Sequence, residues 1–399
     1  MRKLVSLLAG LLLLTALAWA QTDDPLIKIV AQVQGSVVSV NTKSLTYGSI
    51  SSGMRGESSR YQQIATGWLT GFVYDKKGYI ITDSRDLEGA KILTVYTSDN
   101  VELPAEVVGL DQDYGIGVLK VKSDKPLVPV KILETPYDQV KEIYPYGQGD
   151  SVIAIGASGG LGGTVTTGII SAMRNMRNRS GTLIPNMIQS DVKINGGNEG
   201  CPLFNDRGEV IGMHELRGAG LQDISWFTPM WLVNRIAGEL IANYESKKPA
   251  KDFKVWHPWL GIKPYLGPVS GFLGSGMGVG DDLKMFMNIP DQYWDTGFLV
   301  DTVYPDSPSS EYGLMAKDYV FAVTVRDKNE KEVVPYTLIK EIQQLELMVS
   351  TAHKGDVFTF EVLRIPNRLL VEVVIGQHPG AFAFFSVSGL GFERSNQYF

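Results

Sequence analysis

The sequence predicts a mostly β protein, a sandwich or barrel of short strands, followed by a smaller domain that mixes strands with a helix. Two observations favour this fold class. From about residue 25 to 243, apolar runs rich in β-branched residues alternate with Gly and Asp turns, as in all-β sandwiches and barrels. From about residue 256 to 377, one helical pattern stands among further strand patterns, as in α+β domains.

The chain begins with the pattern of a secretory signal peptide. Arg2 and Lys3 precede an apolar run over 4–18, and Ala18-Trp19-Ala20 provides a cleavage site with small residues. We therefore expect export to the periplasm or another extracytoplasmic compartment. The alternative is an uncleaved segment that anchors the chain in a membrane, although the run is short for a span.

Composition and charge exclude several classes of partner and cofactor. The 399 residues are 44% hydrophobic and 20% charged, as in globular chains of about two to three domains, and the net charge is −6. An acidic chain is a poor candidate for binding nucleic acid. Cys201 is the single cysteine, so an internal disulfide is excluded, and the four histidines lack ligand spacing. No metal site and no cofactor are expected.

The expected elements follow one another along the chain. In the first domain we expect a short helix near 26–34 before the strands and a helix at 229–243 after them. A polar segment at 42–67 is expected to be an exposed loop. The expected strands there are 36–40, 71–74, 79–82, 92–96, 117–121 and 151–155. A charged linker follows. In the second domain we expect strands at 297–300, 319–325, 357–363 and 369–375, and a helix at about 335–351.

The segment from Asn195 to Leu203 has the form of a serine-protease nucleophile loop. Its glycines allow a tight turn that aims backbone N–H groups at a substrate oxyanion. Glu199 stands where such a loop needs a serine. A carboxylate cannot be activated as an alkoxide, and we expect it to compete for the oxyanion hole itself.

Several segments, in order, resemble the HtrA (Deg) family of trypsin-like serine proteases with a C-terminal PDZ domain. The segments that carry the resemblance are 75–82, 111–120, 153–156, 168–172 and 208–212. The resemblance implies a trypsin-like double β-barrel followed by a PDZ-like α+β domain. It implies a signal peptide at 1–20, a protease domain at 21–245, a linker at 246–255, a PDZ-like domain at 256–378 with a long insertion at about 265–295, and a tail at 379–399.

The resemblance also locates three catalytic positions, and none of them keeps its family residue. The histidine position holds Arg85, the aspartate position holds Gly115, and the serine position holds Glu199. The oxyanion loop corresponds to Gly197, Asn198 and Glu199. A triad needs a nucleophile, a base and an orienting carboxylate, and arginine stays protonated. No catalytic residue is therefore assigned.

Three arrangements of the altered site stay open. Arg85 and Glu199 would face each other, and we hypothesise an ion pair that plugs the cleft; the alternative is that both point to solvent. Glu199 could instead form a carboxylate pair with Asp83, Asp86 or Asp113. Cys201 could act as a nucleophile with His214 as a remote base, although packing explains this cysteine better.

The PDZ-like domain retains the family's peptide-binding loop. Trp259, Leu260, Gly261 and Ile262 stand where the family holds the terminal carboxylate of a peptide that is added as a strand. The resemblance implies partners that are peptides or unfolded proteins with hydrophobic C-termini. The chain itself ends in such a sequence, at Phe399, so we also expect that it could cap its own groove or that of a neighbouring subunit.

The leading interpretation is an exported pseudoprotease that binds peptides or proteins as an adaptor or chaperone-like protein. The family implies a homotrimer. The alternative is an active endopeptidase with relocated catalytic groups, working in envelope protein quality control. A third interpretation is a structural envelope protein whose peptide groove is permanently filled.

Overall fold

The computed structural model describes residues 24–52, 57–133, 144–158, 160–177, 183–215, 224–247, 255–264, 296–340, 342–364 and 367–377, without the side chains of 47–62 and 343. The expected signal peptide, the insertion at 265–295 and the tail at 379–399 lie outside these ranges. The chain forms two compact units, the first made of 1–136, 144–174 and 186–255 and the second of the remainder. In the described part, no helix combines the length and apolar character required to cross a membrane.

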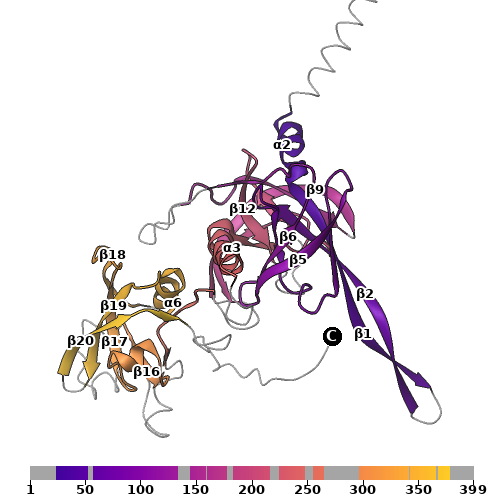
Figure 1. Cartoon of the computed structure of the whole chain (residues 1–399). Coiled ribbons are helices and arrows are strands. Elements are labelled where there is room, and N and C mark those ends of the chain that lie inside the picture. Colours follow the sequence, from indigo (N-terminus) through magenta and orange to yellow (C-terminus); the bar gives the residue numbers. More distant parts are fainter. Residues whose placement is uncertain are drawn as a thin grey trace, which may run out of the picture. The chain divides into compact units, whose positions relative to one another are not determined.

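A closed six-stranded barrel forms the first half of the first unit. Its spatial order is β1-β2-β3-β6-β5-β4 (Figure 1). The strands are β1 (Val37–Ser52), β2 (Glu57–Val73), β3 (Tyr79–Asp83), β4 (Ile92–Tyr96), β5 (Glu102–Asp111) and β6 (Ile116–Val121). Val40, Leu69, Ile80 and Leu119 fill its interior because alternate residues of each strand point inward.

The expected loop at 42–67 is wrong. The segment consists largely of strands β1 and β2, which pair in register from Val37↔Phe72 to Ser52↔Glu57 and extend from the barrel as a two-stranded arm (Figure 1). β1 pairs with β4 only over Ser39–Lys43, so beyond Lys43 the pairing between β1 and β2 continues without β4. Polar side chains are compatible with strands that rely on backbone pairing, and the apolar alternation used to predict strands is therefore missing.

A second barrel completes the first unit. Strands follow the order β11-β8-β9-β10-β13-β12, pairing between β11 and β12 closes the ring, and β7 adds to β12 in parallel. They are β7 (Lys131–Ile132), β8 (Ser151–Ser158), β9 (Leu161–Arg177), β10 (Leu183–Ser190), β11 (Pro202–Phe204), β12 (Glu209–His214) and β13 (Ser225–Pro229). The two expected helices are confirmed as α2 (Pro25–Val33), continued by η1 (Gln34–Ser36), and α3 (Met230–Glu245).

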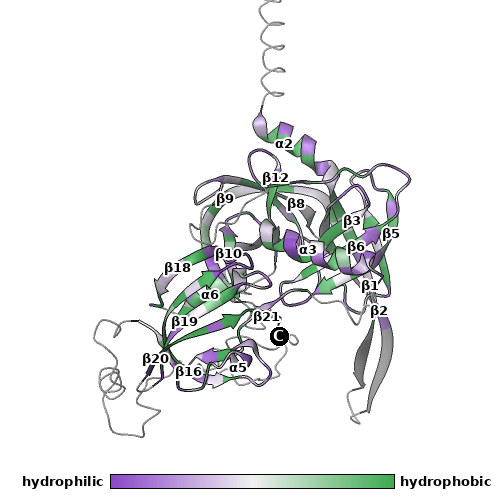
Figure 2. Ribbon diagram, turned by 60° about the vertical axis from the view of Figure 1, so that its left-hand side comes forward, coloured by the Kyte–Doolittle hydropathy of each residue, from purple (hydrophilic) through white to green (hydrophobic). Residues whose placement is uncertain are grey.

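In its described residues, the second unit contains a six-stranded sheet, a two-stranded sheet and two helices. β15-β16-β17-β19-β20 form the main sheet, β18 pairs with β17, and β14 pairs with β21. The elements are β14 (Pro258–Trp259), β15 (Ile262–Pro264), β16 (Phe298–Val303), α5 (Pro308–Glu311), β17 (Tyr319–Arg326), β18 (Glu332–Leu338), α6 (Ile342–Thr351), β19 (Val357–Arg364), β20 (Asn367–Val374) and β21 (Gly376–Gln377). Figure 2 shows hydrophobic residues along the strands of both units.

The helix expected from residue 335 begins only at Ile342, because 335–338 belong to β18. Pro335 cannot donate a ladder hydrogen bond, and β18 lies outside the path of the main sheet, where such a residue is tolerated. The predicted fold class is otherwise confirmed: the chain is mostly β, with two six-stranded barrels and a further β-rich C-terminal domain.

Candidate functional site

The loop between β10 and β11 turns as the glycines predict. Asn198 N–H donates to the Asn195 carbonyl at 3.1 Å, and Cys201 N–H donates to the Asn198 carbonyl at 2.9 Å. Gly197 (φ +96°) and Gly200 (φ +82°) have left-handed backbone conformations. A Cβ on Gly200 would lie 2.5 Å from the Thr70 carbonyl oxygen, so only glycine lets this loop approach the first barrel so closely.

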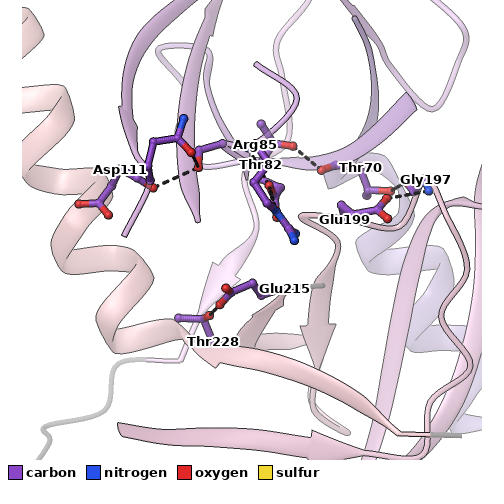
Figure 3. Close-up of polar contacts among 11 residues, drawn as sticks. Thr70, Thr82, Arg85, Asp111, Gly197, Glu199, Glu215 and Thr228 are labelled. Carbon is purple, nitrogen blue, oxygen red and sulfur yellow. Dashed lines mark hydrogen bonds and ion pairs between the residues drawn. The ribbon is translucent and has the colours of Figure 1, made fainter. Parts of the chain in front are cut away.

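The carboxylate of Glu199 folds back onto its own loop. Gly197 N–H donates to Glu199 Oε2 at 2.7 Å (Figure 3). In a trypsin-like site the oxyanion hole consists of the N–H of the nucleophile and the N–H two residues before it, the positions of Glu199 and Gly197 here. One of the two donors therefore already binds an anionic oxygen. This contact is of the kind that the sequence leads us to expect from a carboxylate in such a loop.

Thr70, which the sequence did not indicate, fixes this loop to the barrels. Its hydroxyl is buried, donates to the Gly197 carbonyl at 2.7 Å and accepts from Ala157 N–H at 2.8 Å. Its backbone N–H donates to the Glu199 carbonyl at 2.9 Å. One side chain therefore joins a strand of the first barrel, a strand of the second barrel and the altered nucleophile loop.

Arg85 forms an ion pair with Asp83, whereas the pair with Glu199 stays a hypothesis. Its Nε donates to Asp83 Oδ1 at 2.8 Å, and Nη2 contacts Oδ2. The side chain of Asp83 is 1% exposed and that of Arg85 is 35% exposed. Asp83 lies two residues before Arg85, so its carboxylate can contact the guanidinium at two points. The carboxylate of Glu199 instead accepts a hydrogen bond from Gly197 N–H.

Charged residues from both barrels act on Arg85. Burial acts to lower the pKa of Arg85, but the hydrogen bond and charge of Asp83, with the charges of Glu215 and Glu199, outweigh it and raise the pKa. Figure 3 shows the Arg85 side chain extending into the space between Glu199 and Glu215. A guanidinium is permanently charged, so Arg85 cannot act as a base that gains and loses a proton.

Gly115, at the third position, lies beside a side chain that belongs to the second barrel. Gly115 has φ +68°, its carbonyl accepts from Ser84 N–H at 3.1 Å, and a Cβ there would lie 3.5 Å from the carboxyl carbon of Glu215. Glu215 follows β12, is 7% exposed and accepts from the Thr228 hydroxyl at 3.0 Å. A buried carboxylate therefore lies beside the residue that replaces the family's aspartate.

Thiol chemistry at Cys201 is disfavoured. Cys201 is fully buried, and burial together with the charge of Glu199 raises the pKa of its thiol. His214 is also buried and packs edge-on against Phe227 at 5.4 Å; burial, assisted by the charge of Arg85, lowers its pKa to about 3. Both shifts oppose the thiolate–imidazolium pair that a cysteine nucleophile requires.

The carboxylate-pair alternative gains little from the structure. Asp83 is committed to Arg85, and Asp86 is exposed. Among the described residues, no three His, Cys, Asp or Glu side chains are grouped to hold a metal ion.

The peptide-binding loop expected at 259–262 lies at the edge of the second unit's main sheet. Gly261 has φ +79°, and its carbonyl accepts from Tyr304 N–H at 2.9 Å and from the Ser307 hydroxyl at 3.3 Å. Leu260 is buried, and its carbonyl accepts from Ser309 N–H at 2.9 Å. Ile262 begins β15, the edge strand, which pairs with β16 on one side.

Sequence reasoning missed Thr70 and Glu215, and it considered Asp83 only as a partner of Glu199. The pairing of Asp83 with Arg85 could have been found from their separation of two residues, since an acid at that spacing can reach a neighbouring guanidinium. Glu215 directly follows a strand whose six residues are all buried, and a carboxylate in such a place needs partners. No comparable signal distinguishes Thr70 from the other strand threonines.

Comparison with known proteins shows similarity to trypsin-like peptidases. The family model of the trypsin-like peptidase domain matches residues 69–213. A probable periplasmic DegP-like serine endoprotease of Halomonas elongata is 31% identical over 82% of this chain and 59% of its own length. The putative serine protease HhoB of Synechocystis is 30% identical over 64% of this chain and 56% of its own length. The chain thus spans less than two thirds of these relatives.

Solved structures show the same fold. The HtrA-type protease AlgW with a decapeptide aligns with a TM-score of 0.61 at 21% identity, covering 88% of this chain and 98% of that chain. A serine endoprotease from Yersinia pestis aligns with a TM-score of 0.56 at 23% identity, covering 88% and 97%. At these sequence identities, the similarity is limited to the fold.

Proposed function

We propose that this chain, which is a homologue of the HtrA-type trypsin-like serine endoproteases, is an exported pseudoprotease that binds peptides without cleaving them. The observation that carries the proposal is the hydrogen bond from Gly197 N–H to the carboxylate of Glu199. The nucleophile is missing, and the residue in its place occupies a donor that would stabilise the transition state. Loss of one such donor alone costs a protease about 100- to 1,000-fold in rate.

The residues around Glu199 support the same conclusion. Arg85 is charged at every physiological pH, and Gly115 has no side chain with which to orient a base. The ion pair with Asp83 and the nearby Glu215 give these replacements a structural role. The site is thus a charged plug between two barrels rather than an exposed remnant.

The peptide-binding half of the proposal rests on the second unit. β15 is an edge strand next to the loop 259–262, which is the arrangement that accepts a peptide as an added strand. Related structures of an HtrA-type protease contain a decapeptide or a tripeptide. We propose hydrophobic C-termini of peptides or unfolded proteins as ligands, and a homotrimer as the assembly. The relatives named periplasmic support export to that compartment.

The first test measures turnover. The mature protein and its Glu199→Ala variant are incubated with unfolded casein, with Glu102→Ala as a matched surface control. We expect no cleavage above background by any of the three. Cleavage that survives repurification and disappears only in Glu199→Ala would establish the alternative, an endopeptidase with relocated catalytic groups.

The second test measures binding. Fluorescence anisotropy with labelled peptides that end in Phe, Val or Asp should show saturation only for apolar ends. The same peptides with an amidated C-terminus are the control, because amidation removes the carboxylate and leaves the side chains unchanged. Equal affinity for free and amidated peptides would contradict carboxylate capture by the loop 259–262. Light scattering after gel filtration checks the trimer.

A further inference from the structure

A second concave site lies on the first unit, apart from Arg85, Gly115 and Glu199. It is a cavity of about 620 Å³ between the first barrel, the turn after β4 and the turn that joins β8 to β9. Gly156 lies in its wall, and a Cβ on this glycine would lie 2.3 Å from Asn198 Oδ1 of the nucleophile loop. The volume lies in the range of about 300–1,000 Å³ that is usual for small-molecule sites.

Two aromatic side chains form one part of the cavity. Trp68 and Tyr96 are half-buried, and their ring centroids lie 5.6 Å apart with an interplanar angle of 46°. They come from β2 and β4, on either side of β1, where Ser39 pairs with Tyr96 and Asn41 pairs with Trp68. Strand pairing therefore fixes the position of both rings, which combine apolar faces with a polar N–H or O–H.

A rigid polar turn forms the opposite part. Thr97 Oγ1 donates to Asp99 Oδ1 at 2.6 Å and accepts from Val101 N–H at 3.0 Å. Asn100 has φ +60°, and its N–H donates to the Thr97 carbonyl at 2.8 Å. These bonds hold the turn in one shape, so the exposed side chains of Ser98 and Asn100 are presented to the cavity by a preorganised backbone.

Glycines keep the third part open. A Cβ on Gly160 would lie 3.3 Å from the Trp68 indole, and one on Gly162 would lie 2.9 Å from Ser39 Oγ. A larger residue at either position would fill the space in front of Trp68 or Ser39. Gly160 (φ +81°) and Gly163 (φ +79°) also turn the backbone in conformations that favour glycine.

The chemistry of the lining selects the class of ligand. β1 pairs with β2 and β4 on both edges at Ser39, so this strand offers no free edge for an added peptide strand. Among the described residues that line the cavity, Asp99 alone is charged, and it is paired with Lys125 at 3.1 Å. An anionic phosphate or nucleotide would meet no cation there. Aromatic faces combined with hydroxyl, amide and backbone groups suit a neutral ligand with many hydroxyl groups.

We propose that this cavity binds a neutral oligosaccharide, with sugar C–H faces against Trp68 and Tyr96 and sugar hydroxyls on the turn 97–100. The proposal is independent of the peptide-binding function, because neither the loop 259–262 nor the Glu199 site takes part. It would give the protein a second ligand class, a carbohydrate polymer, beside its peptides.

Isothermal titration calorimetry of the full mature chain tests the proposal. The ligands are the tetramer of β-1,4-linked N-acetylglucosamine and, separately, cellotetraose. We expect saturable binding of at least one of them. Trp68→Ala should weaken it about tenfold or more, since stacking on an aromatic ring contributes on the order of one factor of ten. Gly162→Leu should abolish binding by filling the cavity.

Gly147→Ala is the matched control, because Gly147 has open space around its Cβ position and lies outside the cavity. If Trp68→Ala fails to fold, as judged by circular dichroism, Gly162→Leu decides alone, since it leaves both rings in place. Binding by neither tetramer at millimolar concentration would overturn the proposal. So would binding that Gly162→Leu leaves unchanged, or saturable binding at this cavity of an uncharged tetrapeptide but of neither sugar.

Discussion

Replacing Thr70 by valine should loosen the altered nucleophile loop and destabilise the first unit. Valine keeps the branched shape but removes a buried hydroxyl that donates to the Gly197 carbonyl and accepts from Ala157 N–H. Ala157 lies at an irregularity in the pairing of β8 with β9, between Gly156 and Ser158, so the hydroxyl takes the place of a ladder partner. Each buried polar group left without a partner costs about 1–3 kcal/mol, so the two groups together cost about 2–6 kcal/mol.

The assay combines urea unfolding with hydrogen exchange monitored by mass spectrometry on the full mature chain. We expect a lower urea midpoint and faster exchange of the amides in 195–201, with unchanged exchange in β17 and β19. Thr70→Ser retains the hydroxyl and should lose only about 1 kcal/mol, through its missing methyl group. Thr66→Val, on the same strand but exposed, should be nearly neutral. A Thr70→Val loss no larger than that of Thr66→Val would refute the argument.

Three further predictions concern single residues. Lys317→Gly should raise the melting temperature and stabilise the second unit by up to about 1 kcal/mol, because Lys317 has φ +74°, where an L side chain is strained; a lower melting temperature would show that this lysine contributes more than its strain costs. Cys201 should resist iodoacetamide at pH 8 in the native protein and react after unfolding in urea, because burial and the charge of Glu199 raise its pKa; rapid native labelling would contradict this. His214 has a pKa of about 3 in the folded chain, below its ordinary value of 6.5, so unfolding takes up a proton between these values and stability should fall as pH drops from 6.5 towards 3. His214→Asn should lack this part of the slope, and an NMR signal that is assigned to the His214 imidazole by its loss in this variant and that titrates near pH 6.5 would disprove the low pKa.

Many strands of the first unit were predictable because they alternate buried and exposed residues or are buried throughout, whereas the arrangement in two barrels was implied by the family resemblance. β3 and β12 are buried along their whole length and read as short apolar runs. The arm formed by β1 and β2 could not be found in this way, because it is stabilised by pairing between its own strands. The helix α6 was predicted, but its start was placed at residue 335 instead of Ile342. Residues 335–338 belong to β18, although Leu338 fits the apolar spacing of the helix.

At the site, the sequence predicted three replaced catalytic positions, which stay predictions, and a turn at 195–201 that the hydrogen bonds of this loop now define. A local motif can describe such a turn because its contacts join neighbours in the chain. A motif gives no distances, so the sequence did not indicate the ion pair between Arg85 and Asp83. Glu215 and Thr70 act across the interface of the two barrels, far along the chain from Gly115 and Gly197 respectively, and only the folded chain brings such residues together.

The left-handed backbone at Gly115 has a consequence for any attempt at reactivation. Restoring the family's triad by Arg85→His, Gly115→Asp and Glu199→Ser would place an aspartate at φ +68°, a strain of about 1 kcal/mol or more. The new carboxylate would also lie against that of Glu215, and two like charges in one site disfavour ionisation of both. If the proposed function holds, restoring catalysis at this site therefore requires a fourth change, at Glu215, in addition to the three catalytic positions.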